Sequence, residues 1–171
     1  MMKKLLATFL LLGLVGYGLW QVLATGNEKT TGLEIGNAAP DFALKTLEGK
    51  EIRLSELKGK KVILNFWATW CPPCQAEMPE MQNFYEKYNK DIEILAVNLT
   101  SEDSRDKVDS FIKEYGLTFP VVLDEKGDIL TLYKISPIPT SYMIDSEGII
   151  RHKYVGPMTY DQMVEFTKNI K

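Results

Sequence analysis

The chain has 171 residues, of which 45% are hydrophobic, and a formal net charge of −3. This composition fits one globular domain with an ordinary core and a short additional segment. The balance is mildly acidic and no cluster of Lys and Arg alternates with aromatic residues, which argues against nucleic acid as a partner.

Residues 1–26 are predicted to form a cytoplasmic stub followed by a transmembrane signal-anchor. An apolar run, LLATFLLLGLVGYGLWQVLA, extends from Leu5 to Ala24 without a charged residue. About 20 apolar residues in a helix span the roughly 30 Å hydrocarbon core of a bilayer. Two lysines precede the run, so the positive-inside rule favours a single pass through the cell membrane, with a cytoplasmic N-terminus and an extracytoplasmic domain. A cleaved signal peptide is the alternative, because the run ends in Val-Leu-Ala.

Residues 27–33 are polar and are expected to link this anchor to a domain over residues 34–171. The stretch DFALKTLEGKEIRLSEL, at 41–57, predicts an N-terminal β-hairpin that turns at Glu48-Gly49. The apolar run KVILNFW, at 61–67, is typical of a strand covered on both faces. A helix is predicted from Pro72 to about Tyr88, with proline suited to its first turn.

The second half of the domain continues this alternation. DIEILAVNL predicts a strand, and a helix from near Ser104 carries apolar residues at i, i+3, i+4 and i+7 from Val108. FPVVLD and KGDILTLYKI predict a short strand and a short helix. PTSYMID and GIIRHKYV predict a hairpin, and a last helix runs from Thr159 to about Ile170. This order predicts an α/β sandwich with a mixed sheet.

The only two cysteines of the chain, Cys71 and Cys74, lie in WCPPC at the start of the first predicted helix. A helix N-terminus has a partial positive charge and unsatisfied N–H groups, which stabilise a thiolate. We expect Cys71, at an exposed tip, to attack, and the more buried Cys74 to resolve the mixed disulfide. Pro72 and Pro73 have no N–H, so Cys74 N–H becomes the main donor. This predicts a less acidic Cys71 and a more reducing couple than in strongly oxidising relatives.

Two other uses of the cysteines are weaker. A structural crosslink between Cys71 and Cys74 would close a very small loop and remove little chain entropy. Two cysteines and the single histidine, His152, fall short of the four ligands of a structural zinc site, so no metal and no other cofactor is expected. The pair is therefore interpreted as a dithiol for exchange.

Several motifs resemble the thioredoxin superfamily: FWATWCPPC at a strand-helix junction, Pro79 inside the following helix, and Ile138-Pro139-Thr140 before a strand. The longer stretch from APDF to PEM, residues 39–81, is similar to TlpA/ResA-type thiol-disulfide oxidoreductases, which are tethered to membranes. The resemblance implies a thioredoxin-like three-layer sandwich with a mixed central sheet, an N-terminal β-hairpin and an inserted βα unit at about 118–133.

The resemblance also implies a substrate-binding surface. Pro139 should be cis and face the dithiol, and the backbone of Ile138 should offer a strand-like edge to an incoming chain. Trp70 and Pro72, on either side of Cys71, should complete this surface.

A departure from thioredoxins concerns the proton of Cys74. Thioredoxins carry a buried Asp where this chain has Asn65, and an amide cannot accept that proton. Glu77, one helical turn beyond Cys74, matches an acidic position of ResA-like proteins. A partly buried carboxylate there, with its pKa raised by desolvation, would shuttle the proton. We therefore expect Glu77 to be the third catalytic residue.

The predicted function is reduction of protein disulfides outside the cytoplasm. The resemblance implies apocytochrome c as the substrate, during cytochrome c maturation, and a CcdA-type membrane protein as the electron donor. Three alternatives stay open: a disulfide-forming oxidase, distinguished by its redox potential; a thiol peroxidase using Cys71, distinguished by peroxide consumption; and a binding module that retains the fold without catalysis.

Overall fold

The computed structural model describes residues 13–21 and 30–170. The chain divides into two units, Met1–Thr30 and Thr31–Lys171. In the first unit, residues 13–21 are helical. Across the described ranges, no helix has both the length and the apolar character needed to cross a bilayer. The remainder of the predicted anchor and the start of the predicted linker lie outside those ranges.

A mixed sheet of seven strands organises the second unit, as far as the structure describes it, in the order β2-β1-β5-β4-β3-β6-β7. Strand β3 pairs in parallel with β4, and β4 with β5, whereas the other neighbours are antiparallel. The strands are β1 (Ala43–Lys45), β2 (Glu51–Arg53), β3 (Lys61–Trp67), β4 (Ile92–Asn98), β5 (Val121–Leu123), β6 (Thr140–Ile144) and β7 (Ile150–Val155). The predicted mixed sheet and both hairpins are confirmed.

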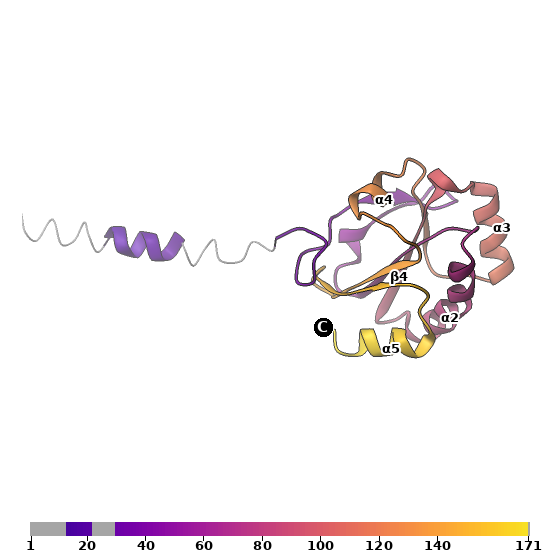
Figure 1. The fold of residues 1–171 in the computed structure, drawn as a ribbon. Helices are drawn as coiled ribbons and strands as arrows, with labels where there is room; N and C mark the ends of the chain where they lie inside the picture. Colours follow the sequence, from indigo (N-terminus) through magenta and orange to yellow (C-terminus); the bar gives the residue numbers. More distant parts are fainter. Residues whose placement is uncertain (1–12, 22–29, 171) are drawn as a thin grey trace, which may run out of the picture. The chain divides into compact units, whose positions relative to one another are not determined.

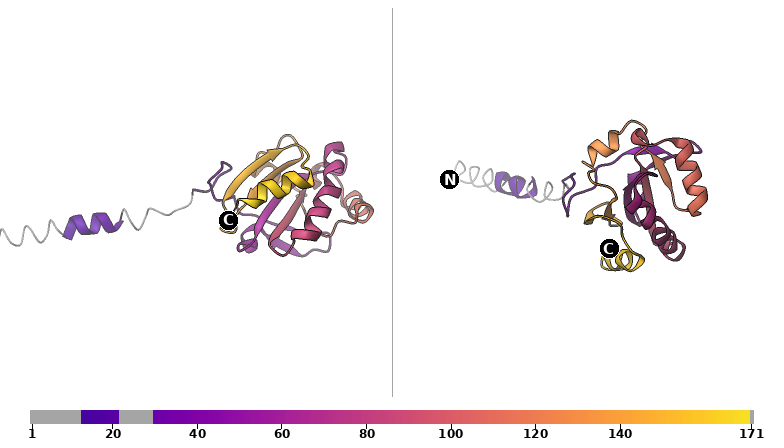
Figure 2. Two further views of the ribbon diagram at one scale, coloured as in Figure 1. Left: turned by 90° about the horizontal axis from the view of Figure 1, so that it is seen from below. Right: turned by 45° about the vertical axis from the view of Figure 1, so that its right-hand side comes forward.

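Helices cover both faces of this sheet, which gives the three layers expected from the sequence (Figures 1 and 2). On one face, α2 lies beside α5, and α3 packs into the same core cluster. On the other face, α4 and the short helix η1 cover a second cluster. The helices are η1 (Leu54–Leu57), α2 (Pro72–Tyr88), η2 (Thr100–Glu102), α3 (Arg105–Tyr115), α4 (Asp128–Leu132) and α5 (Tyr160–Lys168). The predicted insert corresponds to β5 and α4.

The alternation of side chains along β3 explains why an unbroken apolar run is needed there. Ile63 and Trp67 point into the cluster under α2, whereas Leu64 and Phe66 point into the cluster under α4. Successive residues of a strand face opposite sides of a sheet, so a central strand covered on both sides must be apolar throughout. Asn65 is the exception, and it lies on the α2 side, where its amide meets Glu77.

Local signals set the ends of the helices on the α2 side. The Ser104 hydroxyl accepts from the Lys107 amide at the start of α3, and Gly116, with φ of 62°, ends that helix in the left-handed region. Thr159 and Gln162 form a reciprocal capping box at the start of α5. This box fixes the segment just before α5, which contributes a backbone donor to the site described below.

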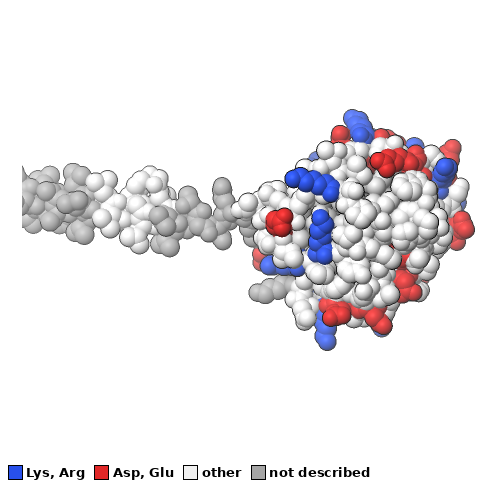
Figure 3. Space-filling view, in the orientation of Figure 1, with Lys and Arg blue, Asp and Glu red and all other residues white. Residues whose placement is uncertain are grey.

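The surface of the domain shown in Figure 3 carries acidic and basic side chains in an intermixed arrangement. Neither sign covers this face as a continuous patch. The face therefore offers no broad basic surface of the kind that binds a phosphate backbone.

Candidate active site

Cys71 and Cys74 are joined by a disulfide at the N-terminus of α2, with their Cα atoms 5.2 Å apart. Cys71 is the N-cap residue of the helix, and its Sγ accepts a hydrogen bond of 3.3 Å from the Cys74 amide. Pro72 and Pro73 occupy the two positions between them and have no N–H to offer. The predicted role of Cys74 N–H as the donor to this sulfur is confirmed.

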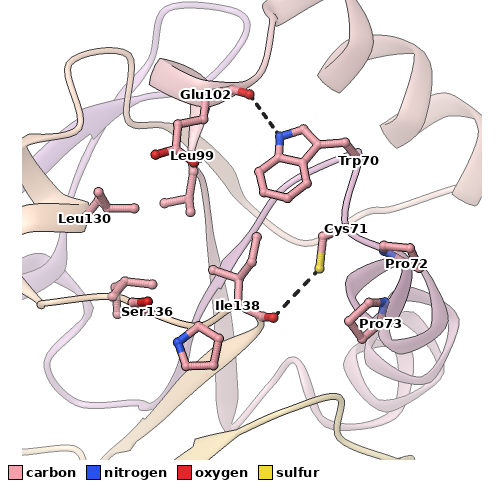
Figure 4. Close-up of a pocket in the computed structure, with 11 residues that line it drawn as sticks. Trp70, Cys71, Pro72, Pro73, Leu99, Glu102, Leu130, Ser136 and Ile138 are labelled. Carbon is pink, nitrogen blue, oxygen red and sulfur yellow. Dashed lines mark hydrogen bonds between the residues drawn. The ribbon is translucent and has the colours of Figure 1, made fainter.

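The expectation that Cys71 lies at an exposed tip is wrong for the disulfide form. Cys71 is 3% exposed and Cys74 is fully buried. The Cys71 Sγ lies 3.9 Å from the carbonyl oxygen of Ile138, which comes from the segment before β6 (Figure 4). This close contact with the segment before β6 helps to bury the sulfur.

A groove of about 460 Å³ lies beside the Cys71 sulfur and is mostly apolar in its lining (Figure 4). Three of the predicted substrate-binding residues line it, namely Trp70, Pro72 and Ile138. The fourth, Pro139, is buried and lies outside the lining. The other lining residues, which the sequence did not point to, are Pro73, Leu99, Glu102, Leu130, Ile135, Ser136 and Pro137.

The peptide bond between Ile138 and Pro139 is cis, as the resemblance implied. The bond between Ser136 and Pro137 is also cis, which the sequence analysis missed. The only signal available in the sequence was a second proline two positions upstream. Of the two prolines, Pro137 lines the groove and Pro139 does not.

The loop between β3 and α2 is held by η2 and by Asp103, the residue that follows it. The Trp70 indole, which is 50% exposed, donates to the Glu102 carbonyl oxygen at 2.9 Å. The amide and the hydroxyl of Thr69 both donate to the Asp103 carboxylate at 2.7 Å. Gln75, from the first turn of α2, donates to the Thr69 carbonyl oxygen. These contacts fix the wall of the groove on one side of the disulfide.

Glu77 lies beneath the disulfide on α2, three residues beyond Cys74, so that both side chains share one face of the helix. It is 1% exposed. Its Oε1 accepts from the Met158 amide at 3.0 Å, and its Oε2 accepts from the Asn65 side-chain amide at 3.1 Å. Burial raises the pKa of Glu77 to about 7, against the opposite effect of these two hydrogen bonds. The predicted burial and raised pKa are confirmed, whereas the role in proton transfer stays a prediction.

A comparison with family models matches residues 35–153 to the AhpC/TSA family. The chain belongs to the AhpC/TSA family. A curated relative, thioredoxin-like protein YneN of Bacillus subtilis, is 46% identical over 95% of this chain and 96% of its own length. Thiol-disulfide oxidoreductase ResA of Bacillus thuringiensis is 42% identical over 98% of this chain and 94% of its own.

Solved structures agree with this assignment. The crystal structure of StoA from Bacillus subtilis has a TM-score of 0.67 and 42% identity, and the match covers 76% of this chain and 98% of StoA. The resemblance to ResA-type proteins and the thioredoxin-like fold are therefore confirmed. This AhpC/TSA family member is a thiol-disulfide oxidoreductase.

Ser141 is a further polar residue at this site that the sequence analysis missed. It lies directly opposite Asn65 in the ladder between β3 and β6, and its hydroxyl accepts from the Asn65 amide at 2.9 Å. Ser141 is fully buried. A serine within a predicted strand was the only available signal, because the pairing register that brings it to Asn65 is not visible in the sequence.

Proposed function

We propose that this protein reduces disulfides of other proteins outside the cytoplasm, held to the cell membrane by the apolar segment at its N-terminus. The position of Cys71 carries the proposal: its sulfur lies at a helix N-terminus, at the wall of an apolar groove, 3.9 Å from the Ile138 carbonyl oxygen. An extended substrate chain in this groove would present its disulfide to that sulfur. The apolar run with preceding lysines supports a single-pass anchor with a cytoplasmic N-terminus.

Reduction proceeds in two exchange steps. The Cys71 thiolate attacks one sulfur of the substrate disulfide, so that a mixed disulfide forms and the other substrate sulfur leaves as a thiolate and takes a proton. Cys74 passes its proton to the Glu77 carboxylate and attacks the Cys71 sulfur. The second substrate sulfur leaves as a thiolate and takes a proton, and the Cys71–Cys74 disulfide seen in this structure is formed. Two electrons thereby move from the protein to the substrate.

Repeated turnover in an oxidising compartment requires an electron donor. We propose a CcdA-type membrane protein for this role, and apocytochrome c as the substrate, on the strength of the similarity to ResA. The groove supports a substrate whose cysteines have small or apolar neighbours, because Leu99, Leu130 and Ile135 line it.

Trapping of the mixed disulfide tests the proposed function and its substrate. With Cys74→Ala, the second step cannot occur, so substrates should accumulate as covalent adducts on Cys71 that a reductant releases. Mass spectrometry of membranes from cells producing this variant should identify secreted dithiol proteins, with apocytochrome c among them. A variant with both Cys71→Ser and Cys74→Ala is the control and should trap nothing. Adducts that are equally abundant in the control would remove the proposal.

The direction of electron flow is tested by equilibrium with glutathione buffers. We expect a potential more negative than about −200 mV, far from the value of about −120 mV of strongly oxidising proteins. Pro73→Ala restores an N–H in the first turn, which stabilises the thiolate and should shift the potential upwards. A wild-type potential near about −120 mV would instead favour a disulfide-forming oxidase.

The peroxidase alternative has one structural argument against it. The Thr69 hydroxyl, which lies two residues before Cys71, is engaged by Asp103 through a hydrogen bond of 2.7 Å. It would have to leave Asp103 to donate to a peroxide at the Cys71 sulfur. A peroxide-consumption assay separates the two activities, since a reductase leaves peroxide unchanged.

The pH dependence tests Glu77. Below a pH of about 7, Glu77 is protonated and cannot accept the Cys74 proton, so the rate of disulfide reduction should rise as the pH increases through about 7. Glu77→Gln should lower the rate by about 100-fold and remove this rise. Glu80→Gln is the matched control, because glutamine retains an acceptor for the Tyr160 amide that Glu80 binds at 2.9 Å. The two variants would behave alike if Glu77 had no part in proton transfer.

A further inference from the structure

Two polar groups near Glu77 could each form one more hydrogen bond: the side-chain oxygen of Asn65 and the hydroxyl of Ser141. Asn65 Oδ1 is buried and has no hydrogen-bond partner within the part of the chain that the structure describes. The Ser141 hydroxyl accepts from Asn65 Nδ2, and no described acceptor takes its own hydrogen. An acceptor and a donor that are both buried and both unsatisfied are costly to leave apart. In the present orientation of the Asn65 amide, they do not meet.

The contacts of Glu77 determine where its proton must lie. Oε1 already accepts from the Met158 backbone amide, which is a donor at every pH, so the proton of the neutral acid belongs on Oε2. Oε2 faces the Nδ2 group of Asn65, which is also a donor. A protonated Glu77 would therefore place two donors against each other in a buried site.

Rotation of the Asn65 amide by half a turn ends the opposition of two donors and brings the unsatisfied acceptor to the unsatisfied donor, while the Nδ2 hydrogens move to the position that Oδ1 now holds. Oδ1 would then replace Nδ2 opposite Glu77 and Ser141, and it would accept from the Glu77 O–H and from the Ser141 O–H. Two hydrogen bonds exist in each arrangement: Nδ2 donates both when Glu77 is ionised, and Oδ1 accepts both when Glu77 is neutral. An amide has both capacities in nearly the same volume, so the rotation needs little additional space.

We propose that Asn65 and Ser141 act as a pair of positioning residues, whose amide and hydroxyl reverse their hydrogen bonds each time Glu77 gains or loses its proton. This inference rests on the proposed role of Glu77 as the acceptor of the Cys74 proton. The reversal explains why position 65 carries an amide. A carboxylate there would compete with Glu77 for the proton of Cys74. Asn65 cannot hold the proton, but it can stabilise Glu77 in both states.

The other ionisable side chains around Glu77 do not replace this pair. Glu80 of α2 binds the Tyr160 amide, and Lys61 of β3 binds the Thr167 carbonyl oxygen. Cys74 is in the disulfide and does not titrate in the oxidised protein. Tyr154 of β7 and Tyr160 of α5 pack against the core cluster that contains Cys74, and neither has a hydrogen bond to Glu77 among the described contacts.

Nuclear magnetic resonance of the oxidised full-length chain in detergent micelles tests the reversal directly. Above the midpoint of the Glu77 titration, the side-chain amide protons of Asn65 should show nuclear Overhauser effects to the Ser141 β protons. Below that midpoint these effects should disappear as the amide rotates, with the same midpoint as the Glu77 carboxyl carbon. Effects that persist unchanged across the Glu77 titration would overturn the inference. Since no substrate is present, this outcome would leave the proposed function standing.

Variants of Ser141 give an independent readout. Ser141→Ala leaves an Asn65 N–H without an acceptor when Glu77 is ionised, whereas Oδ1 keeps a donor when Glu77 is neutral. The Glu77 midpoint should therefore rise by about half a pH unit. Ser141→Thr retains the hydroxyl and should restore the wild-type midpoint, and Ser110→Ala, on the exposed face of α3, should not change it. An unchanged midpoint in Ser141→Ala would contradict the proposal.

Discussion

Replacement of Cys71 by serine is expected to abolish disulfide exchange. Cys71 is the sulfur at the groove wall, so it is the atom that a substrate disulfide reaches first. A serine hydroxyl is not ionised near neutral pH and does not form the mixed disulfide, so the rate of insulin reduction should fall by at least about 1,000-fold. Turbidity of the released insulin chain in the presence of dithiothreitol measures this rate.

The Cys74→Ser variant provides the comparison for this result. It retains the attacking sulfur and should still form mixed disulfides, although it cannot release them in the second step. Intact-mass measurement after incubation with oxidised glutathione should therefore show one added glutathione on Cys74→Ser and none on Cys71→Ser. Glutathione added to Cys71→Ser at a similar rate would make Cys74 the attacking residue and reverse the assigned roles.

The fold was largely predictable because its central elements have strong local signals. The β3 run is apolar apart from Lys61 and Asn65, and the proline-containing start of α2 marks a helix boundary.

 Six of the seven β3 residues are buried, Asn65 among them, and five of the seven are apolar. Burial of both faces thus explains the run, and the single amide within it marks the site.

The groove could not be predicted to the same extent, because its walls come from distant parts of the chain. Ile138 lies 67 residues beyond Cys71 and still reaches its sulfur, which is why the exposed tip expected for Cys71 is buried. Leu99, Leu130 and Ile135 have no pattern of their own that separates them from ordinary core residues. Their place beside the dithiol follows from the sheet order and from the loop before β6.

The environment of Glu77 could be predicted in part, less fully than the fold and more fully than the groove. Helical spacing places Glu77 on the same side of α2 as the buried residues Cys74, Met78 and Met81, so its burial could be expected from the sequence. Its partners could not, since the Met158 amide and the Asn65 side chain depend on how α5 and β3 pack against α2. Local periodicity thus predicts which side chain is buried, and tertiary packing decides how its charge is stabilised.

The largest effect on stability is expected from Phe66→Ala. Phe66 is fully buried on the α4 side of β3, and its ring centroid lies 5.1 Å from that of Tyr133 and 6.3 Å from that of Tyr142. Loss of the ring removes buried apolar surface and leaves a cavity between two aromatic neighbours, so the free energy of unfolding should fall by about 3–5 kcal/mol. Urea unfolding followed by far-ultraviolet circular dichroism measures this change.

Phe166→Ala makes the same chemical change at a partly buried position on α5 and should cost about 1 kcal/mol, because the side chain keeps contact with solvent. At temperatures where Phe66→Ala remains folded, its rate of insulin reduction should stay within about twofold of the wild type, since Phe66 points to the sheet face opposite Glu77. A large loss of activity in the folded variant would show that packing under α4 also positions the groove, through α4 and the segment that follows it up to Ile138, which border both.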